Sequence, residues 1–367
     1  MKKDKYFDED IKIQTIIKHY ILKNCLETSL SIANKNKYHP ENQRKYIYID
    51  CYAGVGLIKE KHKGSPLIAC KEFQKILSKL EKINNYKIIL FEKNEVHYKE
   101  LLNNIKNNCQ NLLKHICVIN DLWTKNIHNY LEKYENDYGF IFIDPYANEY
   151  IDLQILQKII KNNYLKEILI FINLQALRRL IGKGINNSLE IDTKDNLEEE
   201  IHKKFSFLGK EFVLFATIPT EKEGKITNSD YFGLIYMTNS ANVADKFTIA
   251  YKEAFQNIKN VPEALFGNRN IQEEILEILE KYNSISLTLI VRLLQSKYLS
   301  WKKTLKIEEI PTLNKILDEI NILLKENKIF VTSPFFDKRI KKVKKLKKEA
   351  IKSNQNLKQT IISLSKL

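Results

Sequence analysis

The sequence predicts an α/β protein with a doubly wound, mostly parallel sheet. Two observations support this fold class. Short apolar segments typical of buried strands alternate with amphipathic helical segments up to residue 172, and four of the strand-like segments end in acidic or amide side chains. Strict alternation of strand and helix is typical of a parallel sheet with right-handed crossovers and helices on both faces.

The expected elements follow one another regularly from the N-terminus. A helix over residues 11–32 precedes the first strand, Tyr46 to Asp50, whose sequence YIYID ends in an acid. Ser65 and Pro66 predict the start of the next helix, because Ser is a favoured N-cap residue and Pro fits the first helical position. The remaining parallel strands are expected at 86–92, 115–119, 140–143 and 167–172, with helices at 67–80, 96–108, 123–134 and 152–162.

The sheet is expected to end in an antiparallel hairpin. A helical stretch over 175–204, broken at Gly182-Lys183-Gly184, precedes two strands at 211–217 and 231–237. The loop between these strands, PTEKEGKITNSD, has hairpin composition. After a helix over 241–258 the character of the chain changes, and we expect the first domain to comprise residues 1–265.

A small second domain is expected over residues 266–349, with a polar, mobile tail over 350–367. Three predicted helices followed by a strand and a turn give the order of a winged helix, which commonly places its third helix in the DNA major groove. Many winged helices bind proteins instead, and both alternatives stay open. The segment KRIKKVKKLKK contains eight basic residues and no acid. The nucleic-acid-binding residues expected there are Lys338, Arg339, Lys341, Lys342, Lys344 and Lys345.

Composition narrows the class of protein further. The net charge of +15 favours a polyanionic partner, although enrichment in Lys, Ile, Asn and Tyr is also typical of AT-rich genomes. No apolar run reaches the length of a membrane span, and the charged N-terminus is unlike a signal peptide. We therefore expect a cytoplasmic protein without membrane contact. The five cysteines show no CxxC spacing, so no zinc site is predicted.

The ends of four expected strands carry the candidate binding groups. Asp50 precedes a glycine loop, CYAGVG, and the acid Glu92 at the end of the second strand can accept hydrogen bonds from a ribose diol. An Asp after the third strand, Asp121, can accept from an exocyclic amine such as adenine N6. The glycine loop lacks the full GxGxxG pattern, which argues against a pyrophosphate. An adenosine-containing ligand without phosphates, S-adenosylmethionine, fits these residues better.

The segment from Asp50 to Gly56 resembles motif I of class I S-adenosylmethionine-dependent methyltransferases, in the DxFAGxG form of DNA methyltransferases. The combination of YIDCYAGVG, GSPLIA and FIDPYA is more closely similar to the three-Cys-motif partner family of bacteria and phages, over residues 10–260. Members of that family are encoded beside a radical-SAM-like protein. The resemblance implies a Rossmann-like methyltransferase fold and such a partner protein. The cofactor-binding residues that it implies are Asp50, Tyr52, Ala53, Gly54, Gly56, Glu92, Asn120 and Asp121.

The resemblance also implies catalytic residues at motif IV, namely Asp144, Pro145 and Tyr146. In methyltransferases that act on adenine this motif is [DN]PP[YF], whereas this chain has a single proline. Cytosine-C5 chemistry needs a cysteine nucleophile, normally in a Pro-Cys pair, and the sequence has none. Transfer to an exocyclic amine of nucleic acid, of the adenine N6 type, is therefore the predicted activity. The alternative is a catalytically silent scaffold that binds nucleic acid and docks the radical-SAM-like partner in a phage or defence context.

Overall fold

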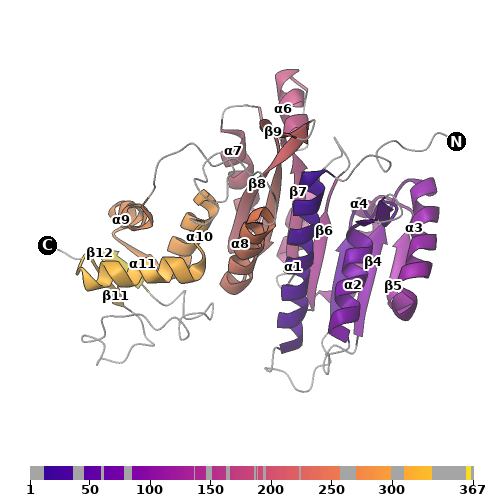
Figure 1. The fold of residues 1–367 in the computed structure, drawn as a ribbon, viewed down its shortest axis with the longest axis horizontal. Coiled ribbons are helices and arrows are strands. Elements are labelled where there is room, and N and C mark those ends of the chain that lie inside the picture. The colour runs from indigo at the N-terminus through magenta and orange to yellow at the C-terminus, as the bar shows by residue number, and fades with distance from the viewer. Residues whose placement is uncertain are drawn as a thin grey trace.

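The structure is a computed structural model, and its described part confirms the predicted class. A seven-stranded, mostly parallel sheet lies between two layers of helices (Figure 1). The residues that the structure describes are 12–35, 45–58, 62–77, 85–135, 137–145, 151–162, 166–185, 187, 189–192, 196–222, 225–256, 270–298, 310–332 and 361–364.

The order of the strands places β1, the first strand of the chain, in the interior of the sheet between β4 and β6. Five parallel strands and a terminal antiparallel pair are arranged in the order β5-β4-β1-β6-β7-β9-β8. The order reverses between β1 and β6, the kind of point at which open α/β sheets bind ligands beyond the carboxyl ends of their strands. The strands are β1 (Lys45–Asp50), β4 (Asn85–Phe91), β5 (Ile116–Ile119), β6 (Tyr138–Ile143), β7 (Lys166–Asn173), β8 (Phe212–Lys222) and β9 (Lys225–Thr238).

Strand residues alternate between two hydrophobic clusters, one on each face of the sheet. Tyr46 and Tyr48 of β1 belong to one cluster, whereas Ile47 and Ile49 belong to the other. Burying each such side chain contributes about 1.5–3 kcal/mol to folding. The first cluster is completed by α1 (Ile13–Lys35), α2 (Ser65–Leu77), α3 (Glu95–Asn108) and α8 (Ala241–Gln256). The second is completed by α4 (Trp123–Leu131), α5 (Leu153–Asn162), α6 (Leu174–Gly182) and α7 (Leu197–Ser206).

Short elements complete this part of the fold. The helical stretch expected over 175–204 is divided into α6 and α7, and both hairpin strands are longer than expected. The two-residue strands β2 (Leu57–Ile58) and β3 (His62–Lys63) pair with each other, and the 3-10 helices η2 (Gln110–His115) and η3 (Glu132–Tyr134) precede β5 and β6. Within the described part of the chain, no helix combines the length and apolarity needed to cross a membrane.

The C-terminal region combines three helices with a small antiparallel sheet of order β10-β12-β11. The helices and strands of this region follow the order expected for a winged helix. That the region is a winged helix stays a prediction. The basic segment 338–348 lies outside the described residues. The elements are α9 (Ile271–Tyr282), β10 (Ser284–Ser286), α10 (Leu287–Tyr298), α11 (Leu313–Lys325), β11 (Ile329–Thr332) and β12 (Ile361–Leu364).

The expectation of a mobile polar tail over 350–367 is wrong for residues 361–364. These residues form β12, which pairs with both β10 and β11. Two contacts explain the order: Ile362 is fully buried, and the Ser363 hydroxyl lies 2.8 Å from the hydroxyl of Ser284.

The C-terminal region packs directly on the larger part of the fold. The Asp245 carboxylate of α8 accepts a hydrogen bond from the backbone N–H of Leu313 at 2.5 Å and another from the side chain of Gln295 at 3.4 Å. The first hydrophobic cluster continues from α1 and α8 into α9, α10 and α11. The third helix of this region, α11, is the one expected to act as a recognition helix, and such a helix presents its N-terminal residues to the bases. The N-terminal end of α11 is instead held against α8.

Candidate functional site

The candidate site lies at the carboxyl edge of the parallel strands. Asp50 ends β1, and Glu92 and Asp144 directly follow β4 and β6, the two strands that pair with β1. Asn120 follows β5, the next strand outward. The structure therefore brings together the strand ends that the sequence predicted to meet.

The glycine loop after β1 is folded tightly against its neighbours. Gly54 and Gly56 have positive φ angles of 61° and 82°, a conformation that costs glycine little. Ala53 donates its backbone N–H to the Phe91 carbonyl at 2.9 Å, and Gly64 donates to the Gly56 carbonyl at 2.8 Å. A Cβ atom on Gly64 would lie 3.1 Å from that same carbonyl oxygen. Close backbone approach on both sides thus fixes the shape of the loop.

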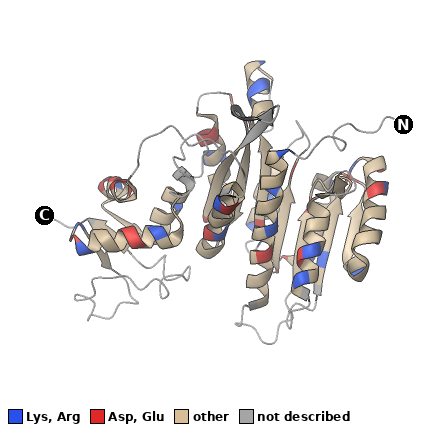
Figure 2. Cartoon of the chain, viewed as in Figure 1, with Lys and Arg blue, Asp and Glu red and all other residues tan. Residues whose placement is uncertain are grey.

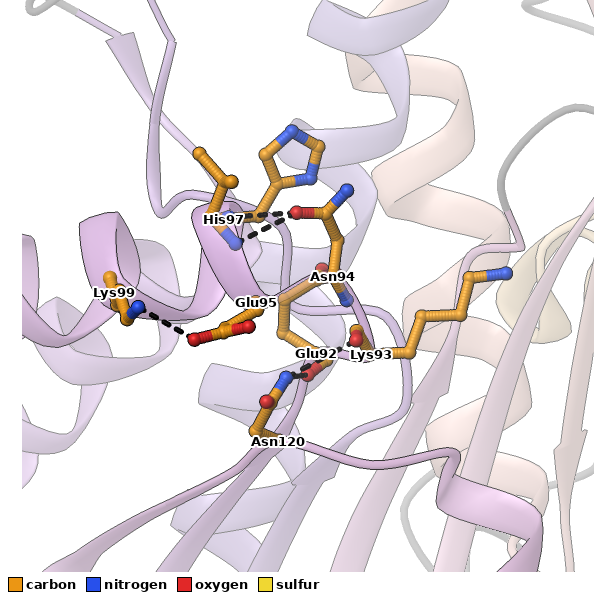
Figure 3. A network of polar contacts seen from close by, with 8 residues as sticks. Glu92, Lys93, Asn94, Glu95, His97, Lys99 and Asn120 are labelled. Atoms are coloured by element: carbon orange, nitrogen blue, oxygen red, sulfur yellow. Dashed lines mark hydrogen bonds and ion pairs between the residues drawn. The ribbon is translucent and has the colours of Figure 1, made fainter. Parts of the chain in front are cut away.

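Glu92 ties this loop to the end of β4. One of its carboxylate oxygens accepts the backbone N–H of Gly54 at 2.9 Å, and the other accepts the backbone N–H of Asn94 at 2.7 Å. Figure 3 shows the network around Glu92, in which the Asn120 side chain also donates to the backbone carbonyls of Glu92 and Lys93. A carboxylate offers about four acceptor positions. Glu92 therefore keeps acceptor capacity for the hydroxyls of a ligand while it holds the loop.

Asp50 is fully buried at the centre of the edge. It accepts hydrogen bonds from the Tyr52 backbone N–H at 3.2 Å and from the Tyr48 hydroxyl at 3.4 Å. Burial raises the pKa of Asp50 to about 7, and the negative charge of Asp144 also raises it. Hydrogen bonds to the Asp50 carboxylate, such as the one from Ser65, lower its pKa and partly offset these effects. The two acids are thus electrostatically coupled across the strand ends.

Asp144 is paired with a lysine that the sequence analysis did not identify. The ammonium group of Lys18, on α1, donates a hydrogen bond to the Asp144 carboxylate. The lysine side chain is 8% exposed and that of Asp144 is 20% exposed. The same ammonium lies 4.5 Å from the centroid of the Phe171 ring, which stacks on Phe232 at 4.8 Å. A cation, an acid and two stacked aromatic rings therefore meet beside β6.

A signal for Lys18 was present in the sequence. It lies on α1 beside the buried residues Ile17, Ile21 and Leu22. A lysine is almost never buried without a partner, so its place among these apolar residues indicated an acid nearby. Only the fold could show that the acid is Asp144, 126 positions away.

Other predicted residues have local roles or fall outside the described part. The Asp121 carboxylate accepts from the Leu122 backbone N–H and the Asn126 side chain and pairs with Lys125 at 3.1 Å, at the start of α4. Its contact with an adenine therefore stays a prediction. Pro145 is partly buried. The predicted residues outside the described part are Tyr146, Lys338, Arg339, Lys341, Lys342, Lys344 and Lys345.

Nothing in the described residues adds a metal site to this edge. No group of three or more His, Cys, Asp or Glu side chains in that part of the chain is placed to hold a metal ion. All five cysteines are free thiols, and Cys51 of the glycine loop is buried.

Comparison with known proteins gives distant matches among solved structures. No family model and no curated protein matches the chain. Among solved structures, protein LPL1258 from Legionella pneumophila has a TM-score of 0.42 at 14% identity, over 67% of this chain and 92% of its own. The METTL16 methyltransferase domain has a TM-score of 0.33 at 12% identity, over 58% and 66% of the two chains. A putative rRNA methylase from Clostridium thermocellum has a TM-score of 0.29 at 11% identity, over 57% and 95%. We base the function on this chain's own residues.

Proposed function

We propose that this protein is an S-adenosylmethionine-dependent methyltransferase that acts on an exocyclic amine of nucleic acid, of the adenine N6 type. The observation that carries the proposal is the placement of Asp144. It follows β6, directly beside the strand that leads into the glycine loop, and it is electrostatically coupled to Asp50. An acceptor for a substrate amine thus lies next to residues suited to an adenosine-containing cofactor.

The residues present fit S-adenosylmethionine. The buried Glu92 carboxylate retains acceptor positions for the ribose hydroxyls, and the glycine loop lets backbone approach the ligand closely. The fully buried Asp50 favours a ligand that carries positive charge, because an opposite charge stabilises a buried carboxylate. When bound, the cofactor supplies an electrophilic methyl group.

Asp144 is proposed to accept a hydrogen bond from the target amine. Such a bond increases electron density on the nitrogen and aligns its lone pair with the methyl group, a positioning effect that contributes strongly to catalysis. Lys18 donates a hydrogen bond to one oxygen of this carboxylate and keeps it oriented. Tyr146 is proposed to stack on the base, which contributes roughly 1–3 kcal/mol per base. A base in a duplex would first have to be flipped out of the stack.

The decisive experiment measures methyl transfer and cofactor binding in parallel. Wild-type protein and the Asp144→Ala variant are incubated with isotopically labelled cofactor and pools of DNA and RNA, while calorimetry follows binding of S-adenosylmethionine and S-adenosylhomocysteine. We expect Asp144→Ala to abolish methyl transfer and to leave the cofactor affinity within about threefold, since the proposal assigns Asp144 to the substrate amine and Glu92 to the cofactor. Glu132→Ala, at an exposed acid of η3, is the matched control and should behave as wild type.

Two results would contradict the proposal. Full turnover in Asp144→Ala would remove Asp144 from the reaction. Cofactor binding without transfer to any nucleic acid would favour the silent scaffold, an alternative motivated by the single proline after Asp144. In that case the docking of a radical-SAM-like partner becomes the function to test.

A further inference from the structure

Helix α6 stands directly beside the candidate site. It begins immediately after β7, the strand next to β6, and Asn173 caps it by accepting the Ala176 backbone N–H at 2.9 Å. In Figure 1 this helix projects beyond the carboxyl ends of the parallel strands. The tip of α6 therefore lies at the same edge of the sheet as Asp144, which follows β6.

All charged residues of α6 and of the turn that ends it are basic. The segment 174–185, LQALRRLIGKGI, contains Arg178, Arg179 and Lys183 and no acid, and Figure 2 shows basic colour alone on this helix. Arg178 forms an ion pair with Glu198 of α7 at 3.0 Å, which holds the helix. Arg179 and Lys183 are exposed, and the described residues offer neither side chain an ion-pair partner. Two cations are therefore available to a ligand.

The C-terminal turn of α6 fixes where these cations lie. Ile185 donates its backbone N–H to the Leu180 carbonyl and Gly184 donates to the Ile181 carbonyl, both at 3.0 Å. Gly184 has a φ of +63°, as the residue that ends a helix in such a turn commonly does. Ile185 remains 48% exposed beyond it. The tip of α6 thus presents the apolar side chain of Ile185 close in sequence to Arg179 and Lys183, and backbone hydrogen bonds hold the turn in shape.

We propose that the tip of α6, formed by Arg179, Lys183 and Ile185, binds the nucleic-acid strand that flanks the target nucleotide. The inference rests on the proposed function and names the surface that holds its substrate. Arg179 and Lys183 contact phosphodiester groups, which carry most of the affinity of proteins for nucleic acids. Ile185 packs against a neighbouring base, as apolar side chains of nucleic-acid-binding proteins do when they unstack bases.

A simpler function of the two cations predicts a different result. Basic residues near the C-terminus of a helix stabilise it by interacting with the helix dipole. If that were their only contribution, replacing them would lower the thermal stability of the protein and leave its binding of nucleic acid unchanged. The salt dependence of binding separates the two explanations, because only lost phosphate contacts reduce it.

The test compares the double variant Arg179→Ala/Lys183→Ala with wild type. Fluorescence anisotropy measures the Kd for single-stranded DNA and RNA of the same sequence at several salt concentrations. Losing two phosphate contacts should weaken binding and reduce the slope of log K against log salt by about 1.4, taking about 0.7 per contact for single strands. The control, Lys106→Ala/Lys114→Ala, removes two exposed lysines of α3 and η2 and should keep the wild-type slope. The two oligonucleotides show which nucleic acid binds.

A third variant and a methyl-transfer assay keep the outcomes distinct. Ile185→Ser should raise the KM for the nucleic acid at least threefold with an unchanged salt slope. If wild type transfers methyl groups but the double variant keeps the wild-type slope and Kd, the inference about α6 is wrong and the proposed function stands. If wild type neither binds nor methylates DNA or RNA, the proposed function itself is overturned, and the inference with it.

Discussion

The Lys18 ammonium on α1 forms a partly buried ion pair with the Asp144 carboxylate at the end of β6. The first helix of the described chain thus supplies a group to the site that four strand ends build. Removing one partner of a buried pair leaves the other charge uncompensated, which costs more than the pair contributes. The pair therefore couples the position of α1 to the orientation of Asp144.

Replacing Lys18 should impair catalysis more than cofactor binding. In Lys18→Met the Asp144 carboxylate loses its hydrogen-bond donor and its counter-charge, so we expect the rate of methyl transfer to fall by roughly 10²-fold, in the range of a lost positioning contact. Steady-state kinetics and calorimetry measure the two quantities. Lys23→Met, on the same helix, is the control. Equal losses in the rate and in the cofactor affinity would show that Lys18 supports the fold as a whole.

Glu92→Gln should weaken cofactor binding. An amide keeps one acceptor oxygen but turns an NH2 group toward one of the two backbone N–H donors, Gly54 or Asn94. We expect at least a tenfold higher Kd for S-adenosylmethionine and a loss of roughly 1–3 kcal/mol in the free energy of unfolding, as for an unsatisfied buried donor. Calorimetry and urea denaturation give both values. Glu95→Gln, at the exposed neighbour that pairs with Lys99, should change neither.

The buried Asp50 should make stability depend on pH. Its pKa is about 7 in the folded protein and near 3.8 in an unperturbed aspartate. Between pH 4 and 7 the folded state therefore holds a proton that the unfolded chain has lost, and the free energy of unfolding falls as the pH rises through this window. The contribution is at most about 1.4 kcal/mol per pH unit.

The Asp50→Asn variant tests this assignment. Urea denaturation at pH 5, 6, 7 and 8 should show a flatter pH dependence than in wild type, because asparagine does not titrate. Some dependence should persist, since burial also raises the pKa of Glu167 to about 7. A dependence as steep as in wild type would show that Asp50 is ionised over the whole range.

Asp245 should hold the C-terminal region in place. In Asp245→Ala the backbone N–H of Leu313, at the start of α11, loses its acceptor on α8. We expect the free energy of unfolding to fall by about 1–3 kcal/mol and hydrogen exchange at Leu313 to accelerate. Glu280→Ala, at an exposed acid of α9, is the comparison. Unchanged exchange at Leu313 would mean that the hydrophobic contact alone fixes α11.

The sequence predicted the sheet and the strand ends because those signals are local. A run such as YIYID followed by a glycine loop shows both a buried strand and the position at its carboxyl end. The Lys18–Asp144 pair depends on how α1 packs across β6 and β7, which no local pattern contains. Strand β12 was missed for the same reason, because Ile362 becomes buried only once β10 and β11 lie on either side of it.

The position of β9 has a consequence for how the protein is made. Strand β7 pairs with β6 on one side and with β9 on the other, although β8 precedes β9 in the chain. During synthesis the outer edge of β7, with the fully buried residues Ile168, Leu169 and Ile170, has no strand to pair with until Thr238 has left the ribosome. An unpaired apolar edge is a template for aggregation. Chains truncated before β9 should therefore depend on chaperones to stay in solution, whereas the full-length chain closes this edge itself.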